Sequence, residues 1–205
     1  GPGLLLEIEG IGKGYSHPIV VKDKIFVTGK KTDDTDAISA YDMSGNLLWE
    51  TVYGRSWVRT YSDSRCTPTY ENGKLYLASG MGEICAVDAQ SGKIIWKVDA
   101  IEKYSGEVPR HGDSESPLLV NDVVVYTTGG EKVSLVAFNK RDGSEVWKTK
   151  SLGGEKSYAS SVLVNHRGED IILTQTAENL IAVRPWDGDI IWHYNLIQFH
   201  GTHQG

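Results

Sequence analysis

Hydrophobic and polar positions alternate along this chain in short runs separated by glycine, asparagine and serine. Runs such as residues 25–28 and 123–126 are rich in β-branched and aromatic side chains, which favour strands. Between residues 67 and 98 four runs follow one another, at 67–70, 74–78, 83–88 and 93–98. The glycine and asparagine in the breaks tolerate the positive φ that tight hairpins need. No segment shows a helical period over a dozen residues, so the pattern predicts sequential antiparallel strands.

This four-run unit recurs four times, with its tryptophans 47, 51 and 45 residues apart. Each copy carries an alanine, then a glycine, and a tryptophan four residues after the glycine. The twelve repeated positions are Ala40, Gly45, Trp49, Ala86, Gly92, Trp96, Ala137, Gly143, Trp147, Ala182, Gly188 and Trp192. A period of this length marks a unit that must stack on its neighbours to bury its faces. We therefore predict an all-β chain of four-stranded propeller blades.

Each repeated residue type has a structural role in such a unit. The glycine ends the turn between the third and fourth strands, where we expect a positive φ. The tryptophan can bury its ring between blades while its N–H donates to a backbone acceptor, and the alanine leaves room for the ring. Asp42, Asp88 and Asn139 precede three of the turns and can cap backbone N–H groups. Arg184 takes that place in the fourth copy and cannot accept a hydrogen bond, so its turn should be held differently.

The repeated Ala-x-Asp-x-x-x-Gly-x-x-x-Trp pattern resembles the tryptophan-docking motif of the PQQ-like propeller family. That family includes quinoprotein alcohol dehydrogenases and BamB-type scaffold lipoproteins. The resemblance covers nearly the whole chain. It implies a ring of seven or eight blades, of which about four are present here, and a bacterial protein exported to the periplasm or cell surface.

The repeat also suggests blade boundaries. Residues 4–10 align with 47–54, so Leu6 takes the tryptophan position. Residues 3–9 should form the last strand of a preceding blade, to which residues 1–15 belong. Complete blades are expected at 16–53, 64–99, 115–150 and 159–195, with 196–205 leading into the next. We expect one partial propeller over 1–205, whose open faces are covered by further blades or by self-association.

Composition narrows the classes of partner and the redox chemistry. The net charge is −6 and the basic residues are scattered, which argues against nucleic-acid binding. No apolar run has membrane-spanning length. Cys66 and Cys85 fall on the first and third strands of one blade, about 9–10 Å apart, which is too far for a disulfide. We expect free, buried thiols.

No complete catalytic site is apparent, and we assign no catalytic residue. The chain has no nucleophile elbow and no phosphate-binding glycine loop. Asp33, Asp34 and Asp36 could bind a hard cation, and His200 and His203 have a spacing seen in metal sites. Solvated loop positions explain them more simply, so no metal and no cofactor are expected. The quinoprotein branch implies PQQ with Ca²⁺, adjacent cysteines and a catalytic Asp, none of which can be matched here.

The remaining candidates lie where chain segments reach the mouth of the propeller channel. Two long connections, 53–66 and 100–114, and the starts of the inner strands converge there. The candidate ligand-binding residues are Tyr15, His17, Trp57, Arg65, Arg110, His111, Glu115 and Tyr158. They could bind a small polar ligand, a peptide or a protein, or simply pack over the blades and line a hydrated channel. We read the chain as a non-catalytic exported binding or scaffold module; the alternative is part of a PQQ-dependent quinoprotein alcohol dehydrogenase, such as one acting on polyvinyl alcohol.

Overall fold

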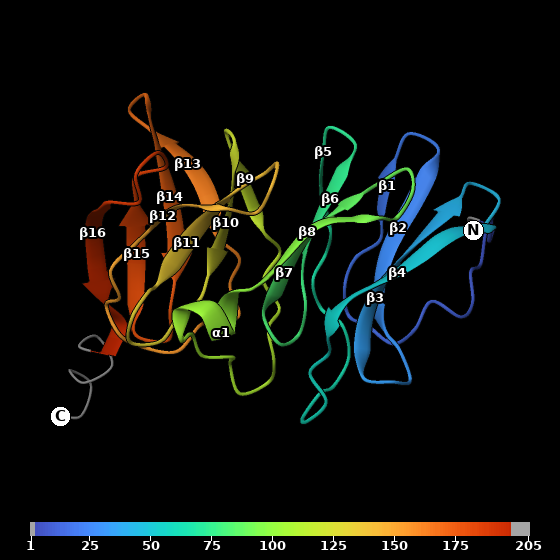
Figure 1. Ribbon diagram of the computed structural model, residues 1–205, viewed down its shortest axis with the longest axis horizontal. Coiled ribbons are helices and arrows are strands. Elements are labelled where there is room, and N and C mark those ends of the chain that lie inside the picture. The colour runs from blue at the N-terminus through green and yellow to red at the C-terminus, as the bar shows by residue number, and fades with distance from the viewer. Residues whose placement is uncertain (1–2, 198–205) are drawn as a thin grey trace.

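Four antiparallel sheets of four strands each lie side by side in chain order in the computed structural model, which describes residues 3–197 (Figure 1). The first sheet contains β1 (Ile19–Val21), β2 (Lys24–Lys30), β3 (Thr35–Asp42) and β4 (Leu47–Arg55). The second contains β5 (Thr69–Glu71), β6 (Lys74–Ala78), β7 (Glu83–Asp88) and β8 (Ile94–Asp99). The third contains β9 (Leu118–Val120), β10 (Val123–Thr127), β11 (Leu135–Asn139) and β12 (Glu145–Lys148). The fourth contains β13 (Val162–His166), β14 (Glu169–Gln175), β15 (Asn179–Val183) and β16 (Ile190–Asn195).

The repeated alanine and tryptophan face each other across the third and fourth strands of every sheet. Ala40 pairs with Trp49, and the pair recurs at the corresponding positions of the other three sheets. A register shift follows the alanine each time, which places the extra residue of a bulge beside the turn. The turn glycines have φ between 72° and 85°, as predicted. These features confirm the prediction of four-stranded blades with tryptophan-docking motifs.

Neighbouring sheets are joined at their outer strands by these tryptophans. A Cβ added to Gly92 would lie 2.6 Å from the ring of Trp49, and Gly143 and Gly188 stand equally close to the rings of Trp96 and Trp147. The indole Nε1 of Trp96 donates to the Lys140 carbonyl at 3.1 Å, and that of Trp147 donates to the Pro185 carbonyl at 3.0 Å. The expectation of a backbone acceptor is wrong for Trp49, whose Nε1 is buried without a hydrogen-bond partner in the described chain.

A second line of contacts joins the sheets at their first strands. The backbone N–H of His17 donates to Thr67 Oγ1 at 3.1 Å, that of Thr67 to Ser116 Oγ at 3.2 Å, and that of Ser116 to Ser160 Oγ at 3.0 Å. These four residues precede the first strand of successive sheets at equivalent positions, and we call them the inner belt. Each joint between sheets is therefore held at both edges.

Arg184 shows how the fourth turn differs from the others. The carboxylate of Asp42 accepts the backbone N–H groups of Ser44 and Asn46, both at 2.9 Å. Arg184 instead forms ion pairs with Asp187 at 3.2 Å and with Asp189 at 3.0 Å. Asp187 also accepts the backbone N–H of Asp189 at 3.0 Å, so this turn is held by ion pairs and a later carboxylate, differently from the first turn, as expected.

Two parts of the chain differ from expectation. A five-residue helix, α1 (Ala100–Tyr104), follows β8; Asp99 caps it by accepting the Glu102 N–H at 3.0 Å, and a helix this short leaves no periodic signal. Residues 3–9 form no strand, because segment 3–12 pairs with no other strand within the described residues. Leu6 nevertheless lies on the turn glycine of the first sheet, with its Cδ1 2.9 Å from a Cβ built on Gly45. The segment thus occupies the docking position without the strand.

The two cysteines are buried and free, as predicted. Burial raises the pKa of Cys66 to about 12, and burial also raises the pKa of Cys85. Cys66 Sγ accepts the backbone N–H of Ala78 at 3.2 Å. Neither thiol is available as a thiolate at neutral pH, so both are packing residues of the second sheet.

Candidate binding surface at the connections between sheets

The connections that leave β4 and β8 both emerge at the lower edge of the sheets in Figure 1, where the chain then returns to β5 and β9. The turns between third and fourth strands lie at the other end of each sheet, because antiparallel strands reverse direction. This placement brings Arg65, His111 and Tyr158 together from the approaches to three different sheets. These three residues, together with Tyr15, Arg59, Tyr61 and Arg110, form what we call the mouth cluster.

His111 is at the centre of the cluster. Its Nδ1 lies 2.7 Å from the Thr60 hydroxyl, and its backbone N–H donates to the Tyr158 hydroxyl at 3.0 Å. The imidazole ring is 5.2 Å from the Tyr61 ring in an edge-on arrangement and 6.1 Å from the Tyr158 ring, stacked. Tyr61 itself has φ 49°, so the backbone holds this exposed ring in the sparsely populated left-handed region.

Three arginines of the cluster have aromatic or backbone contacts and no ion pair among the described residues. The Arg65 guanidinium lies 5.6 Å from the Tyr15 ring centre, and its Nη2 donates to the Tyr61 carbonyl. Its Nη1 is buried without a hydrogen-bond partner. Arg59 lies 5.3 Å from the ring of Trp57, and Arg110 is exposed. None of the three guanidiniums therefore forms an ion pair with a carboxylate within the described residues.

Trp57 and Glu115 are corrections to the candidate residues, since both are buried. Trp57 is 7% exposed; its Nε1 donates to the Thr60 carbonyl at 2.9 Å, and its side chain packs against Gly80 and Gly112. It forms the floor of the surface. Glu115 is fully buried. His17 is exposed, and its backbone N–H forms the inner-belt bond to Thr67.

Glu115 belongs to a buried ionic network that sequence reasoning missed. The Lys156 Nζ, fully buried, lies 2.6 Å from Glu115 Oε2 and 2.8 Å from Asp113 Oδ1, and it stands 3.7 Å above the centre of the Tyr126 ring. The Tyr126 hydroxyl donates to Asp113 as well. Burial raises the pKa of Glu115, and the Lys156 ammonium opposes that shift. We call these four residues the Lys156 network; it ties the approach to β9 to the approach to β13.

The acidic run near residue 34 does not form a cation site. Asp34 pairs with Lys30 at 2.8 Å and Asp33 accepts the Thr35 hydroxyl at 2.5 Å, while Asp36 is buried and accepts the Gly80 N–H at 2.8 Å. Burial raises the pKa of Asp36 to about 6. Among residues 3–197 no three His, Cys, Asp or Glu side chains converge to hold a metal. His200 and His203 lie outside the described residues.

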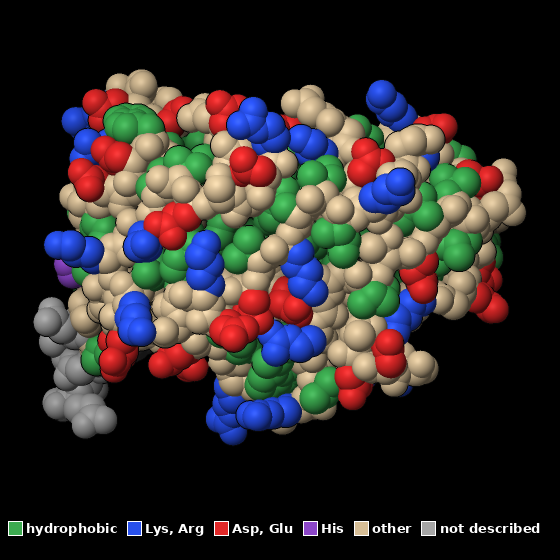
Figure 2. All heavy atoms as spheres, viewed as in Figure 1, with side chains coloured by type: hydrophobic (Ala, Val, Ile, Leu, Met, Phe, Trp, Pro, Cys, Tyr) green, Lys and Arg blue, Asp and Glu red, His purple; other side chains and the backbone are tan. Residues whose placement is uncertain are grey.

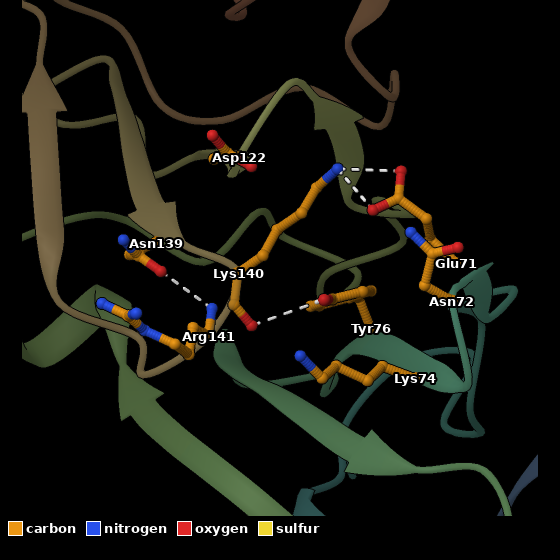
Figure 3. A pocket seen from close by; sticks show the side chains of 8 residues that line it. All are labelled: Glu71, Asn72, Lys74, Tyr76, Asp122, Asn139, Lys140 and Arg141. Atoms are coloured by element: carbon orange, nitrogen blue, oxygen red, sulfur yellow. Dashed lines mark hydrogen bonds and ion pairs between the residues drawn. The ribbon is translucent and has the colours of Figure 1, made fainter.

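A cleft of about 450 Å³ opens between the second and third sheets (Figure 3). Its main cation, Lys140, pairs with Glu71 at 2.7 Å, and the Lys140 carbonyl accepts the Tyr76 hydroxyl at 3.4 Å as well as the Trp96 indole. The cleft is thus the outer opening of a tryptophan joint, with its central lysine committed to that joint. On the face seen in Figure 2, acidic and basic side chains are intermixed. The chain has no helix long and apolar enough to cross a membrane within its described part.

Comparison with known proteins places this geometry in a family. The family model of the outer membrane protein assembly factor BamB matches residues 33–204. The BamB of Yersinia pestis is 27% identical over 154 residues, covering 75% of this chain and 37% of that protein. The crystal structure of BamB from Moraxella catarrhalis superposes with a TM-score of 0.59 at 20% identity, covering 90% of this chain and 49% of that one.

Quinoprotein enzymes share the same fold. A europium-containing methanol dehydrogenase superposes with a TM-score of 0.65 at 16% identity, covering 93% of this chain and 43% of that chain. This chain therefore spans less than half of the relatives and structures just described. The four sheets, their docking tryptophans and the match over most of the sequence lead to one assignment: the chain belongs to the family of the outer membrane protein assembly factor BamB.

Proposed function

We propose that this protein is a non-catalytic binding or scaffold module, exported to the periplasm or cell surface of a bacterium. The proposal rests on a contrast between the buried acids near the mouth cluster and the accessible residues of that cluster. The buried acids Asp113 and Glu115 are committed to Lys156, whereas the tyrosines and arginines of the mouth cluster stay accessible. The buried charged groups hold neighbouring sheets together, and the accessible tyrosines and arginines are suited to binding a partner.

Membership of the BamB family supports this reading, since BamB relatives are named as assembly factors of outer membrane proteins. The likeness to methanol dehydrogenase supports a shared fold alone, because fold does not determine function. Since the chain covers only part of its relatives, the activity and partners of the whole protein are part of the proposal.

The alternative is part of a PQQ-dependent quinoprotein alcohol dehydrogenase. Its Ca²⁺ would need several oxygen ligands converging on one point. In the described chain the buried acids do not fit that donor set. Glu115 and Asp113 surround an ammonium group, and Glu83 forms ion pairs with Lys97 and Arg55. Asp36 is a single carboxylate that accepts the Gly80 N–H. The free cysteines are 19 positions apart in sequence, so they cannot form an adjacent pair.

The test is an activity assay of the 205-residue protein after incubation with PQQ and Ca²⁺. A dye acceptor and a panel of alcohols, including polyvinyl alcohol, report turnover, and an active quinoprotein dehydrogenase serves as the positive control. We expect no PQQ-dependent dye reduction above that of a heat-unfolded sample. Saturable turnover that requires both PQQ and an alcohol would refute the non-catalytic reading.

A further inference from the structure

We propose that the mouth cluster binds an acidic, aromatic-containing segment of a partner protein, with Tyr61 and Arg110 as exposed contact residues. The proposal rests on the non-catalytic binding function above and names the chemistry of its partner. The cluster combines exposed tyrosines with unpaired guanidiniums, and these residue types dominate the energetics of protein interfaces.

Three arginines of the mouth cluster provide positive charge that an acidic segment could bind. Arg59, Arg65 and Arg110 form no ion pair within residues 3–197, although the chain as a whole carries a net charge of −6. Arg65 is fixed by the Tyr15 ring and the Tyr61 carbonyl, and its Nη1 has no acceptor. The exposed guanidiniums of Arg59 and Arg110 are suited to carboxylates, which accept two parallel N–H bonds. An acidic segment would be repelled by most of the surface and attracted here.

Three exposed tyrosine rings determine the shape of the mouth cluster. Tyr61 is 71% exposed, Tyr15 61% and Tyr158 50%, so three large rings face solvent on one surface. The Tyr158 hydroxyl accepts the His111 backbone N–H, the Tyr61 ring lies edge-on to the His111 ring, and the Tyr15 ring lies against the Arg65 guanidinium. Rigid rings provide large contact area at a small entropic cost, which favours stacking with aromatic side chains of a partner.

A protein segment fits this surface better than a small anion does. The guanidinium donors come from two connections, the one between β4 and β5 and the one between β8 and β9, with buried Trp57 as the floor. Small ligands are usually held in enclosed pockets that bury most of their surface. An extended chain can instead reach several arginines and rings in succession.

The experiment uses the 205-residue protein and, as the probe, a random copolymer of glutamate and tyrosine, with binding measured by biolayer interferometry. Tyr61→Ala and Arg110→Ala are the test variants, because both side chains are exposed and neither supports the sheets. Arg141→Ala is the matched control: Arg141 is an exposed arginine at the opposite end of the third sheet. We expect about fivefold or more weaker binding for each test variant and unchanged binding for the control. Binding should also weaken when the salt concentration rises from about 0.1 M to about 0.5 M.

Several results would overturn the proposal. They are undetectable binding of the copolymer, equal weakening by Arg141→Ala, equal binding of polyglutamate lacking tyrosine, and stronger binding of polylysine. Citrate that binds at the mouth as tightly as the copolymer would identify a small-anion site instead. All of these leave the PQQ assay unaffected, so failure of this proposal is distinguishable from failure of the non-catalytic reading.

Discussion

Replacing Lys156 by methionine tests whether the Lys156 network holds the third and fourth sheets together. Methionine keeps most of the volume of the lysine stem and removes the ammonium group. Asp113 and Glu115, 3% and 0% exposed, would then face each other without a cation. The Nζ they now share lies 2.8 Å from one carboxylate and 2.6 Å from the other.

The expected loss follows from the burial of all three groups. Removing one partner of a buried ion pair costs about 3–5 kcal/mol, because the remaining charge is left uncompensated. The contact of the ammonium with the Tyr126 ring is lost as well, so the upper part of that range applies. Domains are typically stable by about 5–15 kcal/mol, so the variant should unfold at a much lower denaturant concentration. The deficit should shrink as pH falls from 7 towards 5, since protonating a carboxylate whose pKa is raised in the folded state favours that state.

Urea unfolding followed by tryptophan fluorescence measures the effect, with Lys148→Met as the control. Lys148 forms an exposed pair with Glu145, and its removal should cost less than about 1 kcal/mol. Adding Asp113→Asn and Glu115→Gln to Lys156→Met should restore most of the stability, because neutral amides replace the unpaired charges. A Lys156→Met variant as stable as the wild type, or no recovery in the triple variant, would show that the network is not a stabilising joint.

Trp96→Ala should destabilise the protein by about 3–5 kcal/mol in denaturant unfolding, whereas Trp186→Ala, at a 62% exposed position, should stay within about 0.5 kcal/mol; equal midpoints would contradict the docking geometry. Trp57→Ala should resemble Trp96→Ala, since both residues are 7% exposed, and a neutral effect would mean that Trp57 is no floor. Burial raises the pKa of Asp36 to about 6, so ionisation of its carboxyl should lower the free energy of unfolding by up to roughly 3 kcal/mol as pH rises from about 4 to about 6. Asp36→Asn should remove this pH dependence in matched urea titrations. Trp192 is 43% exposed at the face of the fourth sheet, so we expect the 205-residue chain to self-associate in a sedimentation concentration series; a monomer at all concentrations would refute this.

The fold could be predicted because its determinants are local and repeated. Gly92 and Trp96 are four residues apart, and one turn with a positive φ and one bulge fix their relation within a single sheet. The stacking partner of each tryptophan is a copy of the same turn, so one motif predicts both sides of the joint. The same logic gave Leu6 the tryptophan position, and the structure places it on Gly45, although the residues around Leu6 form no strand.

The site was predicted less well because it depends on contacts between different connections. Lys156 follows Gly153 and Gly154 and looks like a surface loop residue; only the fold brings it to Asp113, 43 positions earlier. Trp57 stands outside the repeat, and its burial is set by Gly80 and Gly112 in distant segments. Exposed ring positions such as Tyr158 were predictable from their place before an inner strand, where no burial pattern competes.

The inner belt and the docking tryptophans together determine the curvature of the molecule. At one edge a joint is spaced by single hydrogen bonds of 3.0 to 3.2 Å, and at the other by an indole side chain packed against a glycine. Unequal spacers make each joint a wedge, and three wedges of the same construction turn successive sheets in the same sense. A change of ring size at the outer edge should therefore alter the angle between neighbouring sheets without any change within a sheet.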